Sequence, residues 1–201
     1  MHATLMLRQA VTLCPKGIGT IFGDRRRSWT EIGERVPRMA AALRGFGVRD
    51  GAFVAVLAMN SDRYLELFFA IPWAGGALAP MNVRWSVEEN AYALDDCSAI
   101  VLCVDEHYAD QAQILRGRFP GLRAVIYIGE GETPEGMVAY EALIEAHAPA
   151  EDADRRGDDL YAVFYTGGTT GRPKGVAMSH DAAGKVQKNI LRETYRRSTQ
   201  D

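Results

Sequence analysis

The chain has 201 residues, of which 47% are hydrophobic and 24% charged, and its formal net charge is −3. Length and composition are those of an ordinary globular protein with one large or two small domains. The charge balance gives no electrostatic basis for binding nucleic acid or an anionic membrane, and no run is long and apolar enough to span a bilayer.

The first elements predicted are a β-hairpin and a helix. The short β-prone segments 20–22 and 28–30 flank a turn, in which Arg25–Arg27 are expected to be solvated. Apolar residues then recur at helical spacing from Thr30 to Phe46. Pro37 falls inside this pattern and should kink the helix or set its true start.

Short apolar runs alternate with helical patterns in the middle of the chain. Buried strands are predicted at 52–58, 77–80, 99–104 and 123–128. Helices are predicted at 60–73, 86–96, 107–118 and 137–147, and the signature Ser86-Val-Glu-Glu89 is a capping box for the second of these. Repeated alternation of strand and helix predicts an α/β fold with a layered, mainly parallel sheet flanked by helices.

The last part of the chain carries its most informative motif. Residues 149–159 lack apolar periodicity and are predicted to be a loop or linker. A fifth strand, 160–165, follows and runs into the sequence Tyr165-Thr-Gly-Gly-Thr-Thr-Gly-Arg-Pro-Lys-Gly175. A brief apolar run at 176–178 comes next, and Ser179 is then expected to cap a final helix.

This glycine- and threonine-rich segment is predicted to bind the phosphates of a nucleotide. Glycines let backbone amides approach phosphate oxygens, threonines add hydroxyl donors, and a lysine adds a positive charge. The loop also follows a strand, where ligands of α/β sheets bind. The residues expected to contact the nucleotide are Thr166, Gly167, Gly168, Thr169, Thr170, Gly171 and Lys174.

A surface turn and two better-known nucleotide loops fit this segment less well. A plain surface turn would not need three threonines and a lysine between two apolar strands. A Walker loop requires Ser or Thr after its lysine, where this chain has Gly175. The spacing of Gly167, Gly168 and Gly171 is not that of a dinucleotide fingerprint, and an apolar run follows instead of a helix.

The motif resembles the signature of the AMP-forming acyl-CoA synthetases, a superfamily that also holds luciferases and peptide-synthetase adenylation domains. Gly167 stands where many relatives have serine. Upstream segments are similar to other family motifs in the same order, although Asp50 and Gly51 are swapped relative to the usual order. These segments are Ser28–Ile32, Gly47–Gly51, Val54–Asn60 and Trp73–Arg84, so the resemblance covers about Thr20 to His180.

The resemblance implies that residues 1–201 are a partial N-terminal AMP-binding domain of an acid–CoA ligase. The complete enzyme would use ATP, Mg²⁺ and CoA on a small-molecule carboxylic acid. The family's later motifs, which hold the acid, the ribose and magnesium, are absent from this sequence, as is its small C-terminal domain. We therefore expect no catalytic residue within the chain, and little or no ligase activity from the chain alone.

Two other functions remain open at this point. The first is adenylation of an amino or aryl acid for a carrier protein, and the second is a non-catalytic nucleotide-binding or interaction module. Residues 184–201 hold five basic and two acidic side chains without interleaved aromatics, which favours a solvated helix end over nucleic-acid binding. The resemblance is also compatible with a homodimer.

The remaining chemistry-bearing residues are predicted to be structural. Cys14, Cys97 and Cys103 do not have metal-site spacing, and an odd, scattered set favours reduced thiols in a cytoplasmic protein. Cys97 and Cys103 should pack in the core. The four histidines have no partner at ligand spacing, so no metal ligand is expected in this chain.

Overall fold

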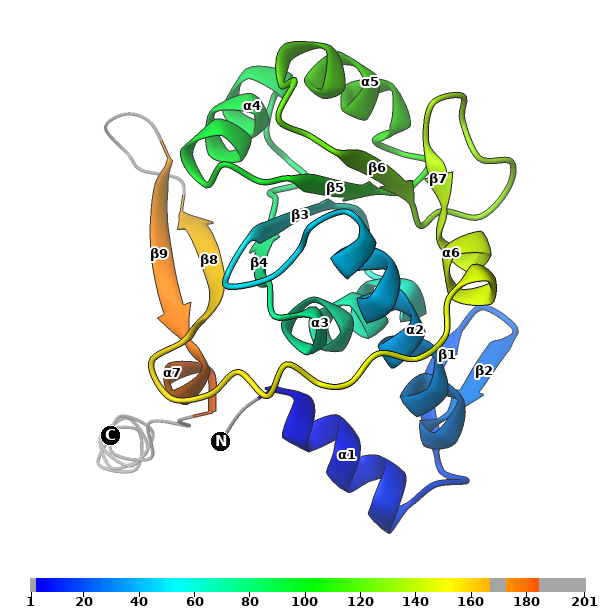
Figure 1. Ribbon diagram of the computed structural model, residues 1–201. Helices are drawn as coiled ribbons and strands as arrows, with labels where there is room; N and C mark the ends of the chain where they lie inside the picture. Colours follow the sequence, from blue (N-terminus) through cyan, green and yellow to red (C-terminus); the bar gives the residue numbers. More distant parts are fainter. Residues whose placement is uncertain (1–2, 167–172, 185–201) are drawn as a thin grey trace, which may run out of the picture.

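A computed structural model describes residues 3–166 and 173–184 (Figure 1). Within these residues a seven-stranded sheet has the order β7-β6-β5-β3-β4-β8-β9. All neighbouring pairs are parallel except β8–β9, which is antiparallel. The strands are β3 (Phe53–Leu57), β4 (Ala77–Pro80), β5 (Val101–Val104), β6 (Ala124–Tyr127), β7 (Val138–Ala139), β8 (Leu160–Thr166) and β9 (Lys174–Ser179).

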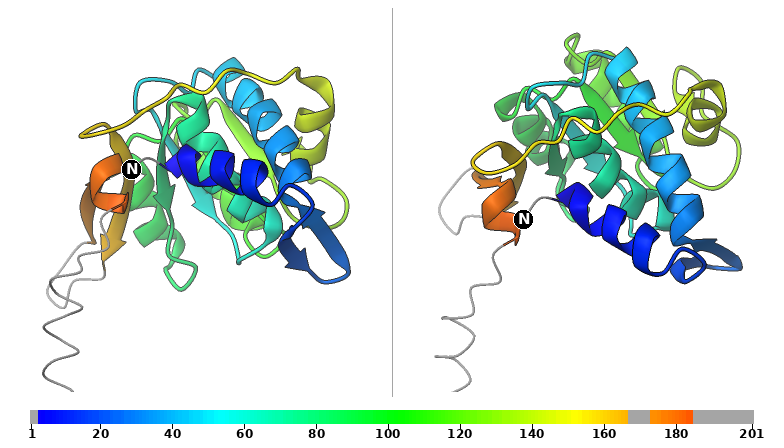
Figure 2. Two further views of the ribbon diagram at one scale, coloured as in Figure 1. Left: turned by 90° about the horizontal axis from the view of Figure 1, so that it is seen from below. Right: turned by 60° about the horizontal axis from the view of Figure 1, so that its bottom comes forward.

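Helices cover both faces of this sheet, as Figures 1 and 2 show. One face carries α1 (Ala3–Leu13), α2 (Trp29–Gly45), α3 (Asp62–Ala74) and α6 (Tyr140–Ala146). The other carries α4 (Val87–Asp96) and α5 (Ala109–Arg118), and the short α7 (His180–Gly184) follows β9. The predicted layered, mainly parallel α/β fold is therefore confirmed.

The central strands are buried on both faces because successive side chains point to opposite sides. In β3, Val54 and Val56 pack with α2 and α3, whereas Ala55 and Leu57 pack with α4 and α5. All four are fully buried. Burial on both faces is the reason that the sequence shows continuous apolar runs there and no polar alternation.

The N-terminal hairpin is present, but its strands differ from the prediction. β1 (Ile18–Phe22) pairs with β2 (Arg25–Ser28), so the turn is only Gly23 and Asp24. The expectation that Arg25–Arg27 lie in a turn is wrong, because all three belong to β2, and the expected exposure to solvent holds only for Arg26. Arg27 is buried, and Arg25 and Arg27 both contact the buried carboxylate of Asp62. Ion pairing to α3 draws these side chains inward.

Local signals place the helix starts well. Ser28 and Ser86 form capping boxes that begin α2 and α4, and the Ser61 hydroxyl caps α3 by accepting from Tyr64. The helix α2 begins at Trp29 and continues through Pro37, so this proline does not set the helix start. The helix α3 ends at Gly75, whose φ of 97° is the left-handed conformation that suits glycine.

The region after β6 departs most from the sequence prediction. The predicted helix 137–147 begins with the two-residue strand β7 at the sheet edge and becomes the helix α6 only at Tyr140. A strand this short leaves no period-2 pattern to detect. The brief apolar run at 176–178 is the centre of β9, which closes the opposite edge of the sheet.

Residues 147–159 form a strap without helix or strand, which runs across the middle of α2 and the C-terminal end of α3 toward β8 (Figures 1 and 2). The amide of Ala150 donates to the Pro37 carbonyl at 3.0 Å. The Trp73 indole donates to the Ala150 carbonyl at 2.9 Å, and Arg8 pairs with Asp152 at 2.9 Å. The strap is thus fastened to three helices.

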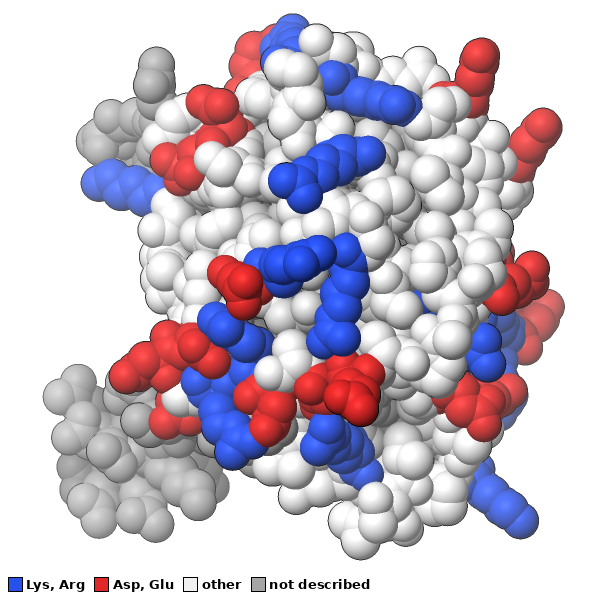
Figure 3. Space-filling model, in the orientation of Figure 1, with Lys and Arg blue, Asp and Glu red and all other residues white. Residues whose placement is uncertain are grey.

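The face displayed in Figure 3 carries charges of both signs. A column of Lys and Arg side chains lies near its middle, with Asp and Glu side chains on either side. Within the described part of the chain, no helix has the length and apolar character needed to cross a membrane.

Candidate nucleotide-phosphate site

The predicted phosphate loop leaves the sheet at the carboxyl end of β8. Because β3, β4, β5, β6 and β8 run parallel, their carboxyl ends lie along one edge, which is where ligands bind in open α/β sheets. The two ends of the loop are β8 and the antiparallel β9. Gly167, Gly168, Thr169, Thr170 and Gly171 lie outside the described residues.

The structure places the two remaining predicted contacts, Thr166 and Lys174, directly opposite each other. The Thr166 hydroxyl donates to the Lys174 carbonyl at 3.4 Å, and both residues are exposed. Residues opposite each other in an antiparallel pair share a face, so both side chains stand on the same side of the sheet. Among the described residues, no acidic side chain forms an ion pair with Lys174.

A hydrogen bond joins the base of the loop to α4. The Tyr165 hydroxyl donates to the Asp96 carboxylate at 2.6 Å, and its ring meets Trp85 edge to face with centroids 6.4 Å apart. Burial, followed by the bond to Asp96, raises the pKa of Tyr165 well above its ordinary value. Tyr165 is therefore a neutral donor that ties β8 to the α4 side of the sheet.

Gly175, the last glycine of the motif, faces Tyr165 across the strand pair. A Cβ at this position would lie 2.9 Å from Val163 Cγ2 and 3.1 Å from Tyr165 Cε1. Both distances are shorter than ordinary van der Waals contact. Close packing of the Tyr165 ring on β9 thus accounts for this glycine without any role in phosphate binding.

Downstream of the loop, the chain is held by packing. Ser179 caps α7 as predicted, since its hydroxyl accepts from the Ala182 amide at 3.2 Å. His180 is 1% exposed and meets the Tyr161 ring edge to face at 5.3 Å. His180 therefore has a structural role, which is to pack at the start of α7.

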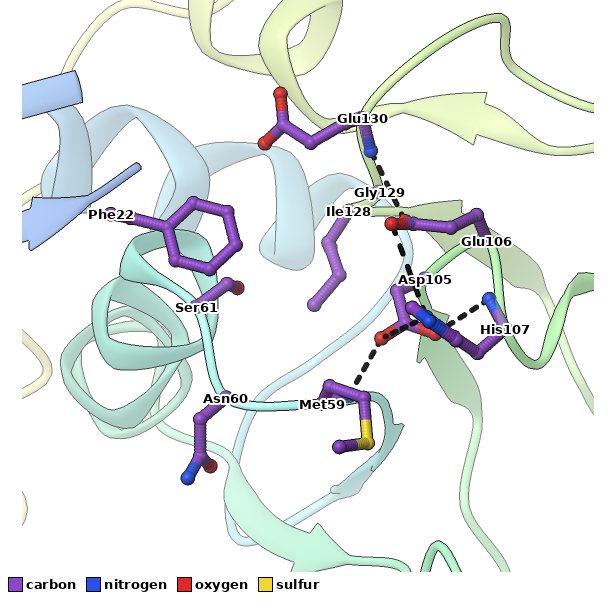
Figure 4. A pocket seen from close by; sticks show the side chains of 10 residues that line it. All are labelled: Phe22, Met59, Asn60, Ser61, Asp105, Glu106, His107, Ile128, Gly129 and Glu130. Atoms are coloured by element: carbon purple, nitrogen blue, oxygen red, sulfur yellow. Dashed lines mark hydrogen bonds and ion pairs between the residues drawn. The ribbon is translucent and has the colours of Figure 1, made fainter. Parts of the chain in front are cut away.

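A second feature of the same sheet edge is a hollow between the ends of β3, β5 and β6 (Figure 4). Its lining comes from segments that directly follow these strands, and from Phe22 at the end of β1. It lies on the far side of β4 from the phosphate loop, because the strand order is β5-β3-β4-β8.

Sequence reasoning missed the Tyr165–Asp96 contact. Asp96 ends α4, and 69 residues separate it from Tyr165. Residues that far apart give no local pattern, and adjacent acidic residues at a helix end are typical of solvated charge. Only the order of the strands brings the two together.

Taken together, the sheet order, the two helical layers and a glycine- and threonine-rich segment that follows β8 are typical of α/β proteins that bind ligands at the carboxyl edge of the sheet. A family model described as "AMP-binding enzyme" matches residues 7–200. The chain belongs to this family, and it corresponds to the N-terminal region of its acid–CoA ligase members.

Two curated relatives illustrate the similarity. The long-chain-fatty-acid–CoA ligase of Thermus thermophilus is 37% identical over 78% of this chain and 28% of its own length. The 2-succinylbenzoate–CoA ligase of Arabidopsis thaliana, described as chloroplastic/peroxisomal, is 30% identical over 89% of this chain and 33% of its own length. The chain thus spans about a third of the length of these relatives.

Solved structures of CoA ligases are similar to this chain as well. An anthranilate CoA ligase in complex with anthranoyl-AMP superposes with a TM-score of 0.83 at 28% identity, covering 90% of this chain and 35% of that one. A fatty acyl CoA synthetase of Mycobacterium tuberculosis gives a TM-score of 0.79 at 25% identity, covering 94% and 37%.

Proposed function

We propose that these residues belong to an ATP-dependent acid–CoA ligase, in which the loop 166–174 holds the phosphates of ATP. The complete protein would convert a carboxylic acid, ATP and CoA to acyl-CoA, AMP and pyrophosphate through an acyl-adenylate. The observation that carries the proposal is the pairing of Thr166 with an exposed Lys174, which has no acidic partner in the described chain. Membership of the AMP-binding family supports it.

The chemistry assigned to the loop is stabilisation of the leaving group. The substrate carboxylate attacks the α-phosphorus of ATP, and pyrophosphate departs with additional negative charge. The Lys174 ammonium and the threonine hydroxyls would neutralise this charge, while glycine amides approach the oxygens closely. Positioning of the acid and the ribose requires other residues, so the 201-residue chain alone should release little pyrophosphate.

Magnesium would supply further charge neutralisation on the phosphates in the complete enzyme. Thr166 offers an exposed hydroxyl oxygen beside the loop, which suits a hard cation that keeps several waters. The carboxylate ligand that the family resemblance implies belongs to a motif outside this sequence. A cytoplasmic location and a homodimer, both expected from the sequence, stay predictions.

The test is pyrophosphate release by the full-length protein with fatty, aryl and amino acids, in the presence and absence of CoA. Lys174→Ala should lower the rate at least about tenfold, because an electrostatic contact to the leaving group is lost. Lys16→Ala is the matched control, because Lys16 is an exposed lysine far from Lys174 in the sequence, and it should leave the rate unchanged. No turnover on any acid would refute the ligase function, whereas turnover unaffected by Lys174→Ala would refute only the loop assignment.

Measuring ATP binding to the isolated chain distinguishes two hypotheses, namely that the chain is part of a ligase or that it is a self-sufficient nucleotide-binding module. ATP is titrated into the 201-residue protein and into its Lys174→Ala variant. Tight binding that the variant abolishes would favour the module. We expect binding weaker than millimolar, since only the phosphate contacts are present in this chain.

A further inference from the structure

The hollow at the ends of β3, β5 and β6 occupies the topological switch point of the sheet. The chain leaves β3 through α3 on one face, and it leaves β5 through α5 on the opposite face. Because neighbouring strands send their connections in opposite directions, the loops part and leave a crevice between them. Crevices at such points are where open α/β sheets bind their ligands.

The crevice has an apolar wall and an acidic rim, as Figure 4 shows. Phe22, Met59 and Ile128 line the apolar side, and Ile128 is almost fully buried. Asp105 and Glu106, which follow β5, lie across the crevice from Phe22, and Met59 lies beside Asp105 (Figure 4). The cavity volume of about 240 Å³ is somewhat below the roughly 300 Å³ at which pockets for drug-sized ligands begin.

The two carboxylates that follow β5 are paired with no Lys or Arg in the part of the chain that the structure describes. Asp105 accepts from the amides of Met59 at 2.6 Å and His107 at 3.0 Å, and these bonds fix its carboxylate at the rim. Among the described residues, no Lys or Arg forms an ion pair with Asp105 or Glu106. Only the His107 imidazole approaches them, with Nδ1 3.6 Å from Asp105 and 3.9 Å from Glu106.

The third acidic residue of the lining differs in this respect. Glu130 pairs with Arg25 at 2.7 Å and with Arg63 at 3.2 Å, so its charge is already balanced. Among the residues that line the crevice, the unbalanced negative charge is therefore confined to the segment after β5, across from Phe22.

We propose that this crevice binds a small organic cation, a primary ammonium group on an apolar body of about ring size. The ammonium group lies between the carboxylates of Asp105 and Glu106, where it supplies the missing counter-charge. The body packs on the Phe22 ring and the Met59 thioether. A phosphate or carboxylate is excluded by the same charges, so this site is distinct from the proposed ATP loop.

The site is also separated in space from that loop. Two strand spacings lie between β3 and β8, which amounts to about 10 Å along the sheet edge. The proposal does not depend on ligase activity and is tested by binding alone.

The experiment uses three probes with nearly the same body and different charge: 2-phenylethylamine, 2-phenylethanol and phenylacetate. They are titrated into the 201-residue protein labelled with ¹³C at the methionine methyl groups. Met59 is 48% exposed at the crevice, and Met6 is 49% exposed on α1 and serves as the internal control. The amine should shift the Met59 methyl signal saturably and leave that of Met6 in place, while phenylacetate should shift neither.

Charge removal at the rim tests the assignment of the ammonium group. Glu106→Gln keeps an acceptor for the Glu130 amide and should weaken amine binding about three- to fivefold, the range for a pair near the surface. Glu135→Gln removes an exposed carboxylate away from the crevice and should change nothing. Asp105→Asn should weaken binding further, with the methionine spectrum reporting whether the fold is retained.

Three results would overturn the proposal. Equal binding of the alcohol and the amine would make the crevice a plain apolar pocket. Amine binding unchanged by both rim variants would place the ammonium group elsewhere. A Met59 shift produced by zinc chloride and not by the amine would make Asp105, Glu106 and His107 a metal site, since their ligand atoms lie within 4.8 Å of one another.

Discussion

Tyr165 has a structural role in the loop motif, whereas other residues of the motif are proposed to contact phosphate. β9 is an edge strand, so within the sheet only β8 holds it. The Tyr165 hydroxyl fastens β8 to Asp96 on α4, and Gly175 leaves room for the ring. Two residues of the motif thus set where the loop begins and ends, without any need to touch nucleotide.

Removing this hydroxyl should loosen the base of the loop. We expect Tyr165→Phe to lower the free energy of unfolding by about 1 kcal/mol, since the bond lies partly in solvent. In the full-length protein, the KM for ATP should rise more than kcat falls, because the loop must then be ordered by its ligand. Urea unfolding and steady-state kinetics measure the two effects.

Tyr161→Phe is the matched control for that variant, as Tyr161 lies on the same strand and packs on His180 through its ring. It should leave the KM for ATP unchanged. Equal changes in KM for the two variants would mean that the effect comes from strand stability and not from the Asp96 contact.

At the scale of elements, a cluster of ion pairs ties the hairpin to the helical layer. Asp62 of α3 accepts two hydrogen bonds from Arg25 of β2 at 2.6 and 2.8 Å and also pairs with Arg27. The adjacent Glu66 accepts from Arg35 of α2 at 2.8 Å. Glu141 of α6 joins the cluster by accepting hydrogen bonds from Arg35 of α2 and Arg63 of α3. A two-stranded hairpin is marginal by itself, so these contacts fix its place.

Breaking the cluster at its buried centre should be costly. Asp62→Asn preserves volume but leaves Arg27 buried without its nearest countercharge, and we expect a loss of about 3 kcal/mol in the free energy of unfolding. Asp24→Asn changes an exposed aspartate in the same hairpin and should alter stability by less than about 0.5 kcal/mol. Chemical denaturation of both variants checks the difference.

The cluster also predicts how stability depends on pH. Burial by itself would raise the pKa of Asp62, but the Arg25 hydrogen bond and the charges of Arg27 and Arg25 outweigh it and hold the pKa below its ordinary 3.8. The pKa of Glu130 is lowered below 4.5, first by its hydrogen bond from Arg25. The stability that these groups contribute is complete above their ordinary values and is lost as pH falls through the lowered ones.

Unfolding free energy should therefore stay level down to about pH 5 and decline below about pH 4, as these carboxylates take up protons. The slope of this decline should be smaller in Asp62→Asn than in the unaltered chain. Denaturant midpoints measured between about pH 3 and pH 6 give both curves, and parallel curves would show that Asp62 is not a source of the dependence.

For the molecule as a whole, the core that lies on both faces of the sheet decides which cysteine thiols can react. Cys97 and Cys103 are buried among the layers, whereas Cys14 is exposed after α1. Burial raises the pKa of Cys97 to about 11 and that of Cys103 further still. Both thiols are protonated at neutral pH and closed to reagents.

A thiol reagent should accordingly modify a single cysteine of the folded 201-residue chain within minutes and all three after unfolding. Peptide mapping should place the rapid label on Cys14. Rapid labelling of Cys103 under native conditions would show that the sheet opens far more readily than its packing implies.

Local signals in the sequence account for much of the fold. Capping serines, the Gly75 stop and the apolar runs of the inner strands act over a few residues, so they can be recognised without tertiary information. The same holds for the loop motif and for the family to which it points. Short elements such as β7 were not predicted, because a strand of only two residues shows no periodicity.

The sequence by itself thus determined the α/β class, the alternation of the inner strands with helices and the identity of the residues proposed to hold phosphate. Only the tertiary structure decided that Arg25 and Arg27 turn inward to Asp62, that Tyr165 meets Asp96, and that the ends of β3 and β5 enclose an acidic crevice. The reason is physical: propensity and capping are local, whereas these contacts join residues tens of positions apart. Strand order, set by burial of both faces of the sheet, brings them together.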